Sequence, residues 1–207
     1  MNITEIRKKS EYVSKKLGYS VNPNLPLIDE PIAIRSTSEI LNRILVLHVV
    51  CAVNVGIDNK IGLRWINEEN LKDSLIESEL ELLEGRKKPN AYENIQVEGL
   101  WALCWVISLV NEMEFDKKCS NDFVFMFPDI KNGENSTEFM KKAIPRDHVE
   151  IYQMLDTAYV LHWGLNHIKL KKLPMPGKAL PYVIIERRRA LEWIITDVQW
   201  DEVALDT

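Results

Sequence analysis

Charged side chains that fall inside apolar, helix-forming stretches are the first candidates for chemistry in this sequence. Glu98, Asp156, Arg187 and Asp201 occupy such positions. An ionised side chain buried without a partner costs several kcal/mol, so side chains of this kind are usually paired. One interpretation is a cleft in which Glu98 or Asp156 faces an arginine and binds a polar ligand or acts as an acid or a base. That arginine would be Arg146 or Arg187. The other interpretation, which we favour, is a closed ion-pair network that fixes the order of the helices. With one histidine added, the candidate set is Glu98, Arg146, Asp156, His162, Arg187 and Asp201.

The four histidines do not follow a metal-binding pattern. His148 and His162 fall near one face of a predicted helix, but at 1.5 Å rise per residue they lie about 21 Å apart. His162 and His167 are five positions apart in the sequence and therefore point in different directions. His48 lies in a strongly apolar run and is expected to be a hydrogen-bonded core residue. We expect no metal ion and no cofactor.

Recognised catalytic motifs are absent from the sequence. The eight glycines are scattered, so there is no glycine-rich phosphate loop, and neither a Gly-x-Ser-x-Gly elbow nor a His-Glu-x-x-His pair occurs. These absences count against common nucleotide-dependent enzymes and serine hydrolases. A small hydrolase or transferase whose carboxylate and arginine cleft is built from Glu98, Asp156 and Arg187 remains an alternative, although we favour a protein that is not an enzyme.

Six tryptophans could line an aromatic cleft or fill the core. Tryptophans on buried helices usually fill core volume while the indole N–H finds an acceptor, so we favour the core. The run of Arg187, Arg188 and Arg189 points around its helix, and an inward Arg187 or Arg188 is expected to pair with a carboxylate. We expect Trp200 and Asp201 to hold the carboxy-terminal tail against the body.

Composition is that of an ordinary globular protein. The 207 residues are 46% hydrophobic and 28% charged, and the net charge of −5 argues against a general nucleic-acid binder. Cys51, Cys104 and Cys119 have no spacing typical of a disulfide framework or a zinc site. The apolar runs at 44–55 and 100–110 fall short of the ~20 residues that span a bilayer, and residues 1–17 lack the apolar core of a signal peptide. We therefore expect a cytoplasmic protein with no membrane partner.

Apolar periodicity predicts an all-α fold, a single compact multi-helix domain with buried central helices. Residues 1–35 form an amino-terminal helix and a proline-containing linker, and residues 36–207 form the core of this one domain. Ser36 and Glu39 form a capping-box pattern that begins the most apolar helix. One short strand or hairpin is expected near 122–128, with a strand at 123–127. The predicted helices cover 3–17, 36–55, 61–67, 77–83, 92–110, 137–142, 147–170 and 182–196.

Ten short segments of the chain, taken in order, carry a family resemblance. They are 39–45 (EILNRIL), 64–66 (RWI), 98–101 (EGLW), 103–105 (LCW), 144–146 (IPR), 155–156 (LD), 162–163 (HW), 186–193 (ERRRALEW), 200–203 (WDEV) and 206–207 (DT). From about Ser38 to the last residue the chain resembles the bacterial family called domain of unknown function 4272. This resemblance implies a bacterial, cytosolic, helical protein and carries no activity or catalytic residue.

One position departs from the family pattern. Gly99 stands where the family usually has alanine or leucine after the glutamate, at a cost of about 1 kcal/mol in helix propensity. The glycine predicts either close helix packing or a shifted helix start.

The leading functional hypothesis is a non-catalytic binding or interaction protein with a protein partner. An acidic helical protein could neutralise a basic partner such as a nuclease toxin, as immunity-type proteins do, because complementary charge speeds association. A third possibility is a structural subunit that self-associates through an exposed apolar face. The sequence leaves the oligomeric state open.

Overall fold

Helices account for the regular structure of this chain in a computed structural model, which describes residues 2–29, 33–90, 94–176 and 179–207. The α-helices are α1 (Ile3–Lys16), α2 (Thr37–Asn54), α3 (Asn59–Glu68), α4 (Glu77–Leu83), α6 (Val97–Val106), α7 (Thr137–Met140), α8 (His148–Lys171) and α9 (Pro181–Ile195). Three 3₁₀ helices join them among the described residues, namely η1 (Lys72–Ser74), η2 (Asn121–Met126) and η3 (Trp200–Glu202). The all-α prediction is confirmed.

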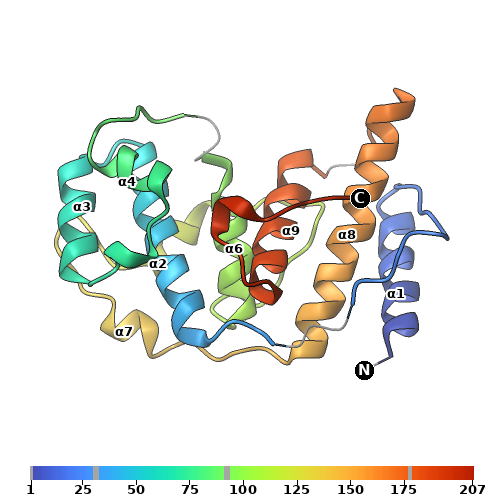
Figure 1. The fold of residues 1–207 in the computed structure, drawn as a ribbon, viewed down its shortest axis with the longest axis horizontal. Helices are drawn as coiled ribbons and strands as arrows, with labels where there is room; N and C mark the ends of the chain where they lie inside the picture. Colours follow the sequence, from blue (N-terminus) through green and yellow to red (C-terminus); the bar gives the residue numbers. More distant parts are fainter. Residues whose placement is uncertain (1, 30–32, 91–93, 177–178) are drawn as a thin grey trace.

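The helices follow one another across the molecule in a row (Figure 1). Helix α1 packs on α8, α8 on α9, α9 on α6 and α6 on α2, while α3 and α4 cover the far side of α2. One continuous apolar core runs through this arrangement. The order of packing places α1 and α4 at opposite ends of the molecule.

Helix α2 begins where the capping box predicts. The Ser36 Oγ accepts a hydrogen bond from the Glu39 backbone N–H at 3.2 Å, and the Glu39 carboxylate accepts one from the Ser36 N–H at 2.9 Å. Among the described residues, α2 is the one helix long and apolar enough to span a membrane, yet 67% of it is buried inside the fold. That burial identifies α2 as the central core helix.

The buried helix predicted at 92–110 ends earlier than expected, at Val106. Its predicted beginning falls on residues 91–93, which lie outside the described part of the chain; residues 94–95 are helical, and α6 begins at Val97. At the other end, Arg146 donates its backbone N–H to the Val106 carbonyl at 2.9 Å, and the Ile144 N–H donates to the Ile107 carbonyl at 3.0 Å. The segment that precedes α8 thus takes over the last carbonyls of α6 and ends the helix.

The strand predicted at 123–127 is wrong, and the described residues contain no strand. This segment forms the 3₁₀ helix η2, in which the Ser120 side chain caps the Asp122 N–H at 3.3 Å and the Phe123 N–H donates to the Ser120 carbonyl at 3.1 Å. These local bonds satisfy the backbone without a neighbouring strand. Alternation of phenylalanines suggested the strand, but Phe125 is 83% exposed while Phe123 and Phe127 are buried.

Gly99 marks a point of close packing. A Cβ atom at residue 99 would lie 3.3 Å from the Trp200 ring and 3.4 Å from the Glu186 carbonyl. The Trp200 indole also donates to the Gln96 side-chain oxygen at 3.2 Å. The absence of a side chain at Gly99 lets Trp200 fasten the carboxy-terminal tail beside α6, as the sequence predicts for Trp200. Asp201, predicted to help hold the tail, is exposed and has no part in this contact.

Candidate functional site

The predicted site residues Glu98 and Arg187 form a closed ion pair between α6 and α9. Arg187 donates to one Glu98 carboxylate oxygen from Nη2 at 2.6 Å and from Nε at 3.0 Å. The other carboxylate oxygen accepts from the Cys119 backbone N–H at 2.9 Å, and Arg187 also donates to the Glu114 and Lys117 carbonyls. Both side chains are 1% exposed. Both oxygens of Glu98 and all three nitrogens of Arg187 therefore have partners inside the protein.

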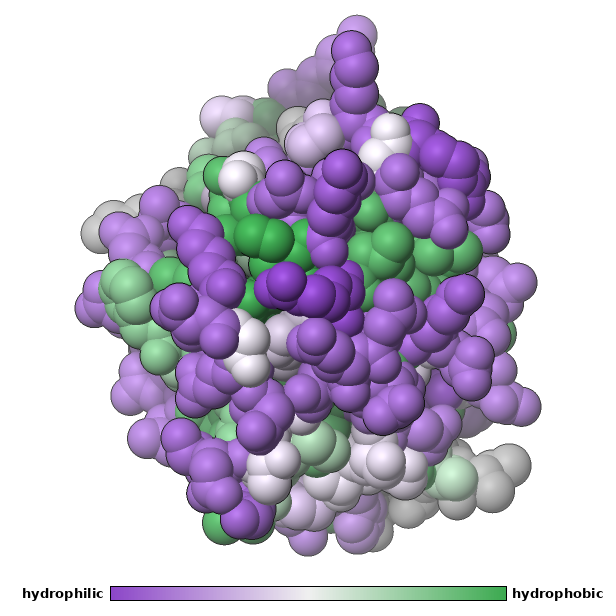
Figure 2. All heavy atoms as spheres, turned by 90° about the vertical axis from the view of Figure 1, so that its left-hand side faces the viewer, coloured by the Kyte–Doolittle hydropathy of each residue, from purple (hydrophilic) through white to green (hydrophobic). Residues whose placement is uncertain are grey.

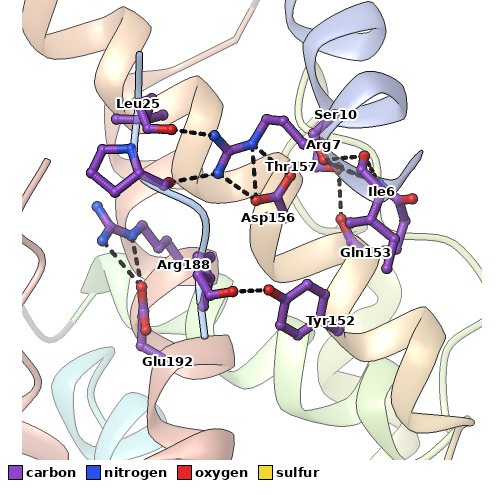
Figure 3. Close-up of polar contacts among 12 residues, drawn as sticks. Ile6, Arg7, Ser10, Leu25, Tyr152, Gln153, Asp156, Thr157, Arg188 and Glu192 are labelled. Atoms are coloured by element: carbon purple, nitrogen blue, oxygen red, sulfur yellow. Dashed lines mark hydrogen bonds and ion pairs between the residues drawn. The ribbon is translucent and has the colours of Figure 1, made fainter. Parts of the chain in front are cut away.

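Asp156 pairs with an arginine that the sequence interpretation did not consider. Arg7 of α1 donates to the Asp156 carboxylate at 2.8 Å from Nη2 and at 3.1 Å from Nε (Figure 3). The same guanidinium donates to the Leu25 carbonyl at 2.7 Å and to the Pro26 carbonyl at 2.9 Å. Arg7, Ser10 and Ser14 are all buried and lie on one face of α1, at positions i, i+3 and i+7. This polar face is the pattern in the sequence that could have indicated Arg7 as a partner for a buried carboxylate.

The seam between α1 and α8 continues this polar network. Gln153 donates to the Ser10 hydroxyl at 3.1 Å, and the Thr157 hydroxyl lies 3.3 Å from the same oxygen (Figure 3). Tyr152, on the same helix, donates to the Ile28 carbonyl of the linker. These contacts hold the amino-terminal helix and the linker on α8.

His162 belongs to a third cluster, around Arg188 of α9. Arg188 lies 2.7 Å from the His162 Nδ1, 3.1 Å from the Glu192 carboxylate and 2.8 Å from the Asp206 carbonyl. Because a guanidinium only donates, His162 Nδ1 is the acceptor and the ring is neutral. Burial and then the charge of Arg188 lower the pKa of His162 to about 4. This cluster ties the carboxy-terminal tail to α8 and α9.

The remaining candidates, Arg146 and Asp201, stand apart from these clusters. Arg146 donates to the Trp105 carbonyl at 2.6 Å and to the Val110 carbonyl at 3.0 Å, and its guanidinium lies 4.6 Å from the centre of the Trp105 ring. Asp201 is exposed in η3. The six candidates thus do not converge on one cleft. Their contacts favour the interpretation of a network that fixes helix order.

An apolar pocket of about 260 Å³ lies elsewhere, between α2, the beginning of α6 and η2. None of the six predicted site residues lines it. Its walls come from the carboxy-terminal half of α2, from two residues of α6 and from the segment 119–127. The lining residues are His48, Cys51, Ala52, Val55, Asn94, Val97, Leu100, Cys119, Ser120, Asn121, Phe123, Val124 and Phe127. A mostly apolar concave wall with a few polar groups is typical of a binding pocket.

His48 is the most specific polar group of this pocket. Its Nε2 lies 3.1 Å from the Pro128 carbonyl, and its ring stacks on Phe127 with a centroid distance of 4.6 Å. Burial lowers the pKa of His48 to about 4, so the ring is neutral at neutral pH. A carbonyl only accepts, so Nε2 carries the proton and Nδ1 remains as an acceptor. The prediction of a hydrogen-bonded core histidine is confirmed.

The Cys119 thiol, which lines the pocket, is protonated at neutral pH. Burial, followed by the charge of Glu98, raises the pKa of Cys119 to about 12. A thiolate, and not a thiol, is the nucleophile in cysteine catalysis, so Cys119 is inert at neutral pH although His48 lines the same pocket.

Apolar side chains at and next to the pocket are exposed to water. Val55 and Val124 line the pocket and are 76% and 56% exposed, and Phe125, which follows Val124 in the sequence without lining the pocket, is 83% exposed. These three residues are called the rim. By contrast, hydrophilic side chains cover most of the face over α3 and α4, with apolar atoms visible between them (Figure 2). Clustered exposed apolar residues beside a pocket mark an interaction site. The sequence interpretation missed this rim because it placed 123–127 in a strand.

Among the described residues, no group of three or more histidine, cysteine, aspartate or glutamate side chains is arranged to hold a metal ion.

Comparison with known proteins identifies one family. The family model described as Domain of unknown function (DUF4272) matches residues 6–203, so the similarity begins within α1 and not only at about Ser38. No curated protein and no solved structure matches the chain. With nearly its whole length matched, the chain belongs to the family Domain of unknown function (DUF4272).

Proposed function

We propose that this chain is a bacterial, cytoplasmic, non-catalytic binding protein that holds an apolar side chain of a protein partner in the pocket between α2, α6 and η2. The observation that carries the proposal is the pocket of about 260 Å³ together with the exposed Val55 and Val124 of its lining and the exposed Phe125 next to Val124 in the sequence. A small molecule would fill the pocket and leave the rim in water. A protein partner would cover both, as protein interfaces bury an apolar centre.

The state of the ionisable groups supports binding over catalysis. Glu98 and Asp156, the carboxylates of the enzyme alternative, already accept hydrogen bonds from arginines inside the protein. In the pocket, the raised pKa of Cys119 keeps the thiol protonated, and the lowered pKa of His48 makes it a weak base at neutral pH. No group that we see in the pocket is prepared for acid, base or nucleophilic chemistry.

The charge of the chain indicates what kind of partner to look for. A net charge of −5 favours a basic partner, because complementary charge speeds association. Neutralisation of a basic toxin in the manner of an immunity protein is one version of this function. In all versions the partner supplies an apolar anchor flanked by basic residues.

The proposal is tested by retention of partners on the purified, immobilised chain. Phe125→Asp and Val124→Asp place a charge on the rim, whereas Leu170→Asp changes a side chain that is 79% exposed at the end of α8. We expect a basic protein that is retained by the unchanged chain and by Leu170→Asp but not by either rim variant. Equal retention by the rim variants, or loss of retention with Leu170→Asp, would overturn the proposal.

A further inference from the structure

The size of the pocket limits the group that can fill it. An engineered apolar cavity of about 150 Å³ admits benzene. The pocket between α2, α6 and η2 measures about 260 Å³ and therefore has room for a larger, bicyclic ring system. Single aliphatic side chains would leave much of it empty, and empty apolar space forfeits dispersion contacts.

The walls of the pocket favour an aromatic occupant. His48 stacks on Phe127, and Phe123 meets Phe127 edge to face with a centroid distance of 5.0 Å. Aromatic rings in such arrangements attract a further ring beyond the effect of buried area alone. All three rings line the pocket.

A single acceptor adds specificity to these walls. His48 directs its protonated Nε2 to the Pro128 carbonyl at 3.1 Å, which turns Nδ1 away from that carbonyl. In the described part of the chain, Nδ1 has no hydrogen-bond partner, and it is not among the fully buried atoms that lack one, so an occupant can reach it and shield it from water. An occupant with an N–H or O–H donor would satisfy Nδ1, whereas an occupant without a donor would leave a desolvated acceptor unpaired.

From these features we infer that the partner's anchor is a tryptophan side chain, whose indole fills the pocket and donates its N–H to His48 Nδ1. The inference rests on the proposed function and names the group that the partner inserts. Tryptophan is also a residue type that often dominates the affinity of protein interfaces. The exposed Val55, Val124 and Phe125 would then contact the backbone and neighbouring side chains of that partner.

Matched small probes test the donor contact on the purified full chain. Indole and benzothiophene have nearly the same shape, but only indole carries an N–H. We expect calorimetric titration at neutral pH to give a dissociation constant for indole roughly tenfold lower than for benzothiophene or 1-methylindole. Equal affinity for indole and benzothiophene overturns the contact to His48 while leaving the pocket, and so the proposed function, intact.

The variant His48→Phe tests whether His48 Nδ1 is the atom that accepts the indole N–H. His48→Phe keeps an aromatic wall beside Phe127 and removes both ring nitrogens. We expect this variant to bind indole and benzothiophene equally well, at about the affinity of the unchanged chain for benzothiophene. A preference for indole that persists in a folded His48→Phe overturns the inference. If the variant does not fold, the comparison of indole with 1-methylindole on the unchanged chain decides.

The last arm distinguishes a partner's tryptophan from a free indole compound. The probes are the capped peptides Lys-Trp-Lys and Lys-Phe-Lys. We expect the tryptophan peptide to bind more tightly than both the phenylalanine peptide and free indole, because its backbone also contacts the rim and its lysines are attracted by the net charge of −5. Tighter binding of free indole would mean a small-molecule site and would overturn the inference of a docked side chain.

Discussion

The interfaces between the helices and the pocket beside α2 treat their polar groups in opposite ways. At the helix interfaces, every predicted site residue that is buried has a charged or polar partner, as in the pair of Glu98 with Arg187 and the pair of Asp156 with Arg7. The buried pair of Arg43 on α2 with Glu79 on α4 follows the same pattern. Around α2 and η2, the polar groups of His48 and Cys119 are set in an apolar wall that opens to solvent. Buried charge by itself therefore marks architecture in this protein. The pocket beside His48 has the opposite character, with few polar groups in its wall and one ring nitrogen left as an acceptor.

The largest expected effect tests whether the buried ion pairs stabilise the fold, and it follows from removing one member of the pair between α6 and α9. Arg187→Met leaves Glu98 buried and unpaired, and we expect a loss of about 3–5 kcal/mol in the free energy of unfolding, measured by denaturant titration. Adding Glu98→Leu to the same chain should recover most of that loss, because no buried charge then remains. A loss below about 1 kcal/mol in Arg187→Met would show that the pair does not act as architecture.

Each region also contains one histidine that titrates with folding. The folded pKa of His162 and of His48 is about 4, below the ordinary value of 6.5. The unfolded chain therefore binds protons first, and the stability that both neutral rings contribute above pH 6.5 is lost as the pH falls toward 4. The expected total is a few kcal/mol.

Variants separate the two histidines. His162→Gln and His48→Phe should each flatten the decline in unfolding free energy between pH 6.5 and 4, measured by denaturant titration at a series of pH values. Only His48→Phe should change the binding of indole. An unchanged slope in both variants would contradict the neutral state of these rings.

Filling the pocket should affect binding far more than stability. Ala52 lines the pocket, so Ala52→Leu would occupy part of its volume without cutting into the ion-pair region. We expect a change in unfolding free energy below about 1 kcal/mol, because the added side chain enters open space. Binding of indole should fall at least tenfold in calorimetry. Unimpaired indole binding would place the probe elsewhere on the molecule.

The smallest effect on stability is expected at the rim. Phe125 is 83% exposed, so Phe125→Asp should change the unfolding free energy by no more than about 0.5 kcal/mol. Thermal denaturation checks this, and Leu170→Asp serves as the matched control. A large destabilisation by Phe125→Asp alone would mean that the ring packs within the fold and is not available to a partner.

Local patterns in the sequence determined most of the helices. The first helix, the helix at 147–170 and the last helix were predicted to within one residue of α1, α8 and α9. The capping box at Ser36 and the core position of His48 also follow from the sequence. Helical period, caps and apolar runs act over a few residues, so they can be read without the fold.

The sequence did not predict which arginine pairs with which buried carboxylate. Asp156 selects Arg7, which lies 149 positions away in the sequence. Arg146 and Arg187 were equally plausible from composition, because the sequence shows that a buried carboxylate needs a cation but not which helix brings one. Packing of α1 on α8 decides the matter.

What the sequence by itself determined is therefore an acidic all-α chain with a central apolar helix, paired buried charges and the segments of its family. Tertiary structure alone decided which charges pair, that residues 121–126 form a 3₁₀ helix, and that a pocket opens beside His48. The physical reason is that secondary structure follows from contacts a few residues apart. A pocket is volume left unfilled where distant elements meet, and no local pattern encodes it.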